Sequence, residues 1–181
     1  MKTKVIVIIS IIVLFVFIPL AIIGGIKYRN YVAEIEAVEL PEIVFERSVV
    51  NTDDTCLCRI IDKEGNIYSS KKFWTANELF QMYKDNRLNE EFEYVGEVNL
   101  FVLKNKYKIF LDLVANPEYE VIEPTEVPDY FAPSYSWWGY YYNSNEEVDV
   151  MLFYKNYFGD YEVTDERGKE LADWITDAVL D

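Results

Sequence analysis

Histidine is absent from the chain, and cysteine occurs only twice in 181 residues. The lack of histidine excludes Ser-His-Asp and Cys-His nucleophile systems, histidine-ligated metals and the ordinary proton switch near neutral pH. Two cysteines are too few for a disulfide-dense secreted scaffold. The sequence also lacks a P-loop, a dinucleotide fingerprint and the Gly-x-Ser-x-Gly and Ser-x-x-Lys motifs. We therefore expect no cofactor, no metal and no enzymatic activity.

Basic residues are scarce as well, with 17 Lys and Arg against 32 Asp and Glu. The imbalance is greatest in residues 116–181, where three basic residues face sixteen acidic ones, a net charge of −13. A surface this negative repels nucleic acid and attracts a basic protein or cations. Simple solubility of an exposed domain is the alternative explanation. At 51% hydrophobic residues the chain is too apolar to be disordered as a whole.

The longest apolar segment is residues 5–26, which carry no charge. As a helix these 22 residues reach roughly 33 Å, enough to cross a hydrocarbon core of about 30 Å. The run is longer than a signal-peptide core and ends without a good small-x-small cleavage site. We therefore expect an uncleaved anchor in the lipid bilayer.

Charges beside the anchor predict its orientation. Lys2, Lys4 and the terminal amine precede the run, whereas Lys27 and Arg29 follow it. This small excess favours a cytoplasmic N-terminus and an extracytoplasmic C-terminal domain. Residues 27–41 lack glycine and have their only proline at the end, which predicts a helical stalk continuing to residue 40.

The remainder, residues 42–181, reads as an α+β domain of antiparallel hairpins with helices packed on one side. A Thr-x-x-Glu capping box at Thr75 marks the start of one helix, and Thr164 is the expected cap of the last. Residues 100–114 fit a helix capped by Asn99, although a hairpin turning at 104–106 fits almost as well. Strands are expected at 43–50, 55–61, 67–68, 93–98, 119–122, 137–142 and 148–154, helices at 75–88, 100–114 and 164–180, and a proline-rich loop at 123–133.

An aromatic block between residues 130 and 161 is the densest candidate site. Because side chains two apart share a strand face, Trp138, Tyr140 and Tyr142 should line one side of the last hairpin. Either both sides of this hairpin are buried, or one side is a partly exposed aromatic platform for a partner. The acidic turn next to it adds charge to such a platform. The candidate partner-binding residues are Trp138, Tyr140, Tyr142, Glu146, Glu147 and Asp149.

Cys56 and Cys58 share one face of an expected strand. A redox or metal role would require an exposed pair and further ligands. We expect both to be buried as small apolar residues, with a strained disulfide as the alternative.

Together these features predict a membrane-anchored, non-enzymatic extracytoplasmic domain that binds a protein partner or a cell-wall component. Two alternatives stay open. One is a hydrolase of wall polymer that uses two carboxylates. The other is a small structural subunit that acts in a membrane complex through its anchor.

Overall fold

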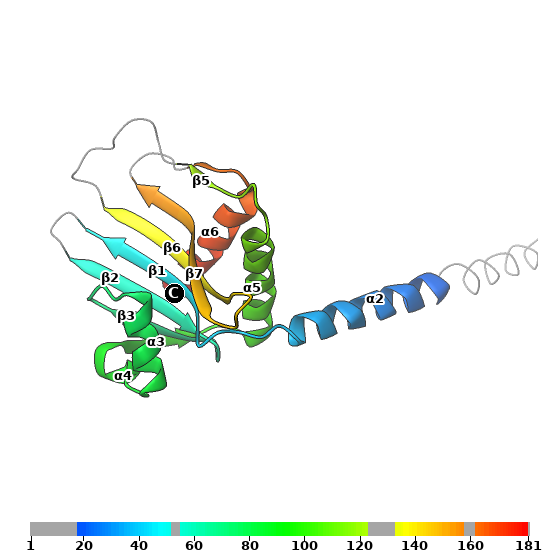
Figure 1. Cartoon of the computed structure of the whole chain (residues 1–181). Helices are drawn as coiled ribbons and strands as arrows, with labels where there is room; N and C mark the ends of the chain where they lie inside the picture. The colour runs from blue at the N-terminus through cyan, green and yellow to red at the C-terminus, as the bar shows by residue number, and fades with distance from the viewer. Residues whose placement is uncertain (1–17, 52–54, 123–132, 158–161, 181) are drawn as a thin grey trace, which may run out of the picture. The chain divides into compact units, whose positions relative to one another are not determined.

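The computed structural model describes residues 18–51, 55–122, 133–157 and 162–180 (Figure 1). The chain divides into two units, Met1–Val38 and Glu39–Asp181. Helix α2 (Ile18–Glu36) is the described element of the first unit. It ends at Glu36, four residues earlier than the expected end of the stalk. Residues 5–17 of the expected anchor lie outside the described residues.

Among the described ranges, no helix is both long enough and apolar enough to cross a membrane.

The second unit is an α+β domain built on an antiparallel sheet, as the sequence predicts. Six strands pair in the order β4-β3-β2-β1-β6-β7, and a separate two-stranded ladder joins β5 to β8. The strands of the main sheet are β1 (Ile43–Val50), β2 (Cys56–Asp62), β3 (Asn66–Ser70), β4 (Glu93–Glu97), β6 (Ser134–Tyr142) and β7 (Val148–Tyr157). The remaining elements are α3 (Ala76–Lys84), α4 (Leu88–Glu91), α5 (Leu100–Val114), β5 (Val121–Ile122), β8 (Glu162–Val163) and α6 (Glu166–Leu180).

The helices cover both faces of the main sheet, which corrects the expectation that they pack on one side (Figure 1). Adjacent residues of β2 show this directly. Cys58 packs in a cluster with Leu79 of α3 and Leu88 of α4. Arg59, which points the opposite way, donates from Nη1 to the carbonyl of Val179 in α6. The sheet is therefore the middle layer between α3–α4 and α5–α6.

Phe45 of β1 is the centre of the core on the α5–α6 face. Its fully buried ring makes edge contacts with Phe110 of α5, at 5.8 Å between centroids, and with Trp174 of α6, at 6.2 Å. Edge contacts of this kind favour a defined ring geometry in addition to the free energy of burial. On the other face, Tyr140 of β6 meets Phe80 of α3 at 5.3 Å.

Local hydrogen bonds explain where the helices begin. The capping box at Thr75 is present, and Asn99 accepts the amides of Phe101 and Val102 at the start of α5, so the helix prediction for 100–114 is confirmed. The cap predicted at Thr164 is wrong. The Asp165 carboxylate accepts the amide of Arg167 instead, whereas the Thr164 hydroxyl donates to the Glu118 carbonyl beside β5.

The expected helix of residues 75–88 is in fact two helices. The first ends at Lys84, and Asn86 then adopts a left-handed conformation with φ of 56°. A second helix, α4, begins after this turn at Leu88. The Leu88 side chain is buried in the cluster that also contains Leu79 of α3.

Candidate functional site

The three aromatic candidates, Trp138, Tyr140 and Tyr142, lie on β6 of the β6–β7 hairpin. β6 lies between β1 and β7, and its ladder with β7 shifts register between Trp137 and Trp138. Trp137 contacts the Tyr154 ring on one face, at 5.1 Å between centroids, whereas Tyr140 packs against α3 on the other. Trp137 and Tyr140 therefore lie on opposite faces of β6, as alternation along the strand predicts.

The three aromatic candidates differ in exposure, so they do not form one continuous exposed platform. Tyr140 is 1% exposed, and its hydroxyl donates to the carboxylate of Glu46. Trp138 is half-buried. Tyr142 is 38% exposed, with its hydroxyl 3.4 Å from an oxygen of Glu42. Tyr142 is the member of this group that a large partner can contact most directly.

The turn that joins β6 to β7 is an ordered acidic projection. The Asn143 side-chain oxygen accepts the amides of Asn145 and Glu147 at 2.9 and 3.2 Å, and Glu146 adopts a left-handed conformation with φ of 61°. Glu146, Glu147 and Asp149 are all exposed. None of these carboxylates makes an ion pair with a lysine or arginine in the described part of the chain. The turn thus presents negative charge in a fixed backbone geometry.

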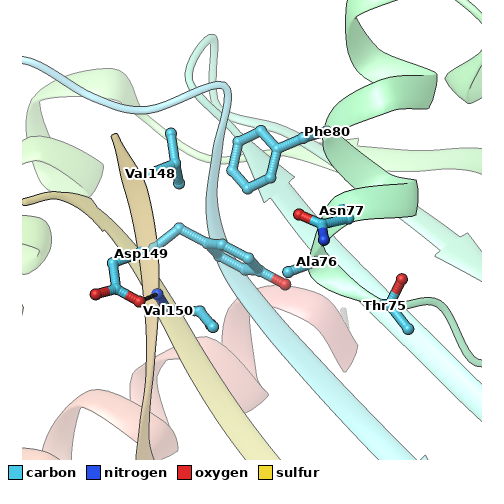
Figure 2. Close-up of a pocket in the computed structure, with 8 residues that line it drawn as sticks. Thr75, Ala76, Asn77, Phe80, Val148, Asp149 and Val150 are labelled. Atoms are coloured by element: carbon cyan, nitrogen blue, oxygen red, sulfur yellow. Dashed lines mark hydrogen bonds between the residues drawn. The ribbon is translucent and has the colours of Figure 1, made fainter. Parts of the chain in front are cut away.

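A pocket of about 330 Å³ lies between the start of α3 and the β6–β7 hairpin. Figure 2 shows Phe80 and Val148 on one side of it and the polar groups of Thr75 and Asn77 at the start of the helix. Asp149 is the only carboxylate among the described lining residues. A glycosidase requires two opposed carboxylates in one cleft, and this pocket does not supply them. The residues lining the pocket are Thr75, Ala76, Asn77, Phe80, Tyr140, Val148, Asp149 and Val150.

Beneath this pocket Glu46 is buried in the sheet, with 4% of its surface exposed. Its carboxylate accepts hydrogen bonds from Ser48 and Tyr140, and the Cys58 sulfur lies 3.7 Å away. Burial raises the pKa of Glu46, although the hydroxyl donors of Ser48 and Tyr140 oppose the shift. Glu46 is not among the described residues that line the pocket.

The two cysteines occupy the same face of β2 near Glu46 and form no disulfide. Cys58 is fully buried, as predicted, and burial together with the negative charge of Glu46 raises the pKa of its thiol well above the usual range. Cys56 is half-buried. Among the described residues, no group of three or more Cys, Asp or Glu side chains is arranged to hold a metal ion.

The sequence analysis missed two arginines in the centre of the sheet. Arg47 of β1 and Arg59 of β2 are cross-strand neighbours. Arg47 is 6% exposed, and its guanidinium lies beside the rings of Tyr135 and Trp137, 5.3 and 5.7 Å from their centroids. The available signal was one basic residue within each of two largely apolar strands, Arg47 in IVFERSVV and Arg59 in CLCRIID.

No family model, curated protein or solved structure matches the chain. Its function is therefore inferred from its own residues.

Proposed function

We propose that the chain is a membrane-anchored, non-enzymatic protein whose residues 42–181 form an extracytoplasmic domain for binding a basic protein partner. The acidic β6–β7 turn carries this proposal. Glu146, Glu147 and Asp149 are exposed on an ordered turn and are not paired with any described basic residue. Such a surface favours approach and orientation of a positively charged partner.

The composition of the domain supports the same role. The net charge of −13 in residues 116–181 strengthens the field around the turn, and exposed Tyr142 adds apolar area next to it. Tyrosine suits interfaces because it combines a large apolar ring with a polar hydroxyl. The uncharged run at residues 5–26 supports anchorage in the membrane, and the flanking basic residues favour an extracytoplasmic domain.

A cell-wall component is the second candidate ligand, and the pocket at the start of α3 favours it. The pocket combines the ring of Phe80 with the hydroxyl of Thr75 and the amide of Asn77 (Figure 2). Aromatic rings beside a few polar groups are suited to holding a sugar ring or a short peptide.

Photo-crosslinking in cells that express the full chain tests the primary proposal. With a benzophenone amino acid in place of Tyr142, we expect a crosslinked product that is mostly lost in the E146Q/E147Q/D149N variant. The control is E166Q/E170Q/D173N, which removes the same charge from exposed positions of α6 and should retain the product. A product that survives loss of the acidic turn, or that both variants lose equally, would contradict binding at this turn.

A further inference from the structure

The two arginines of the central strands lack anionic partners in the described structure. Arg47 and Arg59 face each other across β1 and β2, and the side-chain Nε of each is buried without a hydrogen-bond acceptor. Neither arginine forms an ion pair with a described carboxylate. Glu46, adjacent to Arg47 in sequence, points to the opposite face and is held by Ser48 and Tyr140. Two like charges therefore lie side by side inside the domain.

The groups that do contact these arginines compensate their charge only in part. Arg47 lies beside two aromatic rings, and cation–π contact is weaker than a hydrogen-bonded ion pair. Arg59 donates a hydrogen bond from Nη1 to the carbonyl of Val179, near the C-terminal end of α6. Each guanidinium carries five N–H donors, and the Nε donor of each has no acceptor among the described residues. Burial lowers the pKa of Arg47, and the neighbouring charge of Arg59 lowers it further.

We infer that Arg47 and Arg59 form a binding site for an oxyanion, a phosphate or carboxylate group, on the α6 face of the sheet. Planar guanidinium groups match the geometry of both anions and can bind them through paired hydrogen bonds. The rings of Tyr135 and Trp137 limit the access of water to Arg47, which strengthens such bonds. Arg59 is half-buried and provides the more open side of the site.

The site is independent of the proposed partner surface. The acidic turn follows β6 at Tyr142, whereas Tyr135 lies near the opposite end of the same strand. Binding of an oxyanion at the arginine pair and binding of a basic partner at the turn can therefore fail separately.

Thermal unfolding of the purified full chain in a neutral detergent tests this inference. We expect inorganic phosphate to raise Tm by several degrees with saturation in the millimolar range, relative to sodium chloride at equal ionic strength. Acetate tests the carboxylate form of the ligand. The same shift in chloride would mean general screening and would overturn the inference.

Variants separate the arginine pair from other positive charges. The phosphate-dependent rise should disappear in R47M and R59M, and persist in R167M, whose arginine is exposed and paired with Asp165 at 2.6 Å. R47K keeps the charge but loses the planar fork, so its response should be weakened. If R47M does not fold, tryptophan fluorescence provides a second measurement on chains that keep both arginines. We expect phosphate to change the tryptophan fluorescence of the wild-type chain and expect this change to be lost in W137F. A full response in folded R47M and R59M would overturn the site.

Discussion

Glu46 is the residue at which burial and charge conflict most clearly. Its carboxylate lies in the sheet with hydroxyl donors from Ser48 and Tyr140, and no described lysine or arginine pairs with it. Burial raises its pKa above the ordinary value of 4.5. A carboxyl group whose pKa is raised by folding stabilises the fold most fully below its unfolded pKa. That stabilisation is lost as the pH rises through the folded pKa.

We therefore expect E46Q to raise Tm by a few degrees near neutral pH, corresponding to about 1 kcal/mol. Glutamine removes the buried charge. Its one carbonyl oxygen can accept a hydrogen bond from Ser48 or Tyr140, and its amide nitrogen can donate to the oxygen of the other hydroxyl. The gain should shrink as the pH falls toward 4.5, where wild-type Glu46 also becomes neutral. Thermal unfolding between about pH 4.5 and pH 8 measures this difference.

Glu93 of β4 is exposed and provides the matched control. E93Q should leave Tm nearly unchanged across the same pH range. An E46Q variant that is less stable than the wild type at neutral pH would show that the charged carboxylate contributes net stability through its hydrogen bonds.

A glycine of β6 lies where α5 packs against the sheet. A Cβ atom added to Gly139 would come within 2.4 Å of the Phe110 ring, which belongs to the core around Phe45. The ring cannot move freely because it also contacts Phe153 at 5.7 Å. A side chain at residue 139 would therefore force α5 away from the sheet.

We expect G139A to destabilise the domain by about 1–3 kcal/mol, the usual cost of overpacking a filled core. G96A is the control, since a Cβ at this strand position would meet only the Ile67 side chain at 4.0 Å. Urea unfolding of both variants measures the difference. Equal stability of the two would mean that the α5–β6 contact adapts at low cost.

The sequence predicted elements well where local chemistry decides them. The capping box at Thr75 and the cap at Asn99 are formed by residues within one helical turn, so their signal is complete in a short segment. Thr164 also fits a cap locally, yet it bonds to Glu118 and Glu120, which only the β5–β8 pairing brings near. The placement of helices on both sheet faces likewise depends on long-range packing.

The same distinction applies to the candidate site. Strand alternation correctly predicted that Trp137 and Tyr140 lie on opposite faces of β6, because side-chain direction follows from the backbone. It did not predict that Tyr140 is buried, since this depends on α3 covering one end of that face and on the acceptor Glu46 from a distant strand. The arginine pair was missed for a related reason, because the register of β1 with β2 brings Arg47 beside Arg59.

For the whole molecule, the placement of the domain relative to the membrane decides which partners it can meet. We expect a C-terminal epitope tag to be digested by protease in intact spheroplasts, since the charges around residues 5–26 favour an extracytoplasmic domain. Removal of residues 1–26 should release the chain from the membrane fraction. A cytoplasmic protein that carries the same tag is the control, because its tag should be digested only after lysis if the membrane is intact. Protection of the chain's own tag until lysis would place the domain in the cytoplasm.

The position of β1 in the sheet also affects the order in which the domain can assemble during synthesis. Val50 of β1 pairs with Cys56, which follows closely in sequence, and with Ser134, which is made much later. Strands β1 to β4 can therefore pair with one another before β6, the other neighbour of β1, has been synthesised. Such distant pairings slow folding, and an open apolar edge invites pairing with other chains. A nascent chain that stops before β6 thus leaves open one edge of a strand that is buried along nearly its whole length in the complete domain, so aggregation is the expected fate of incomplete copies.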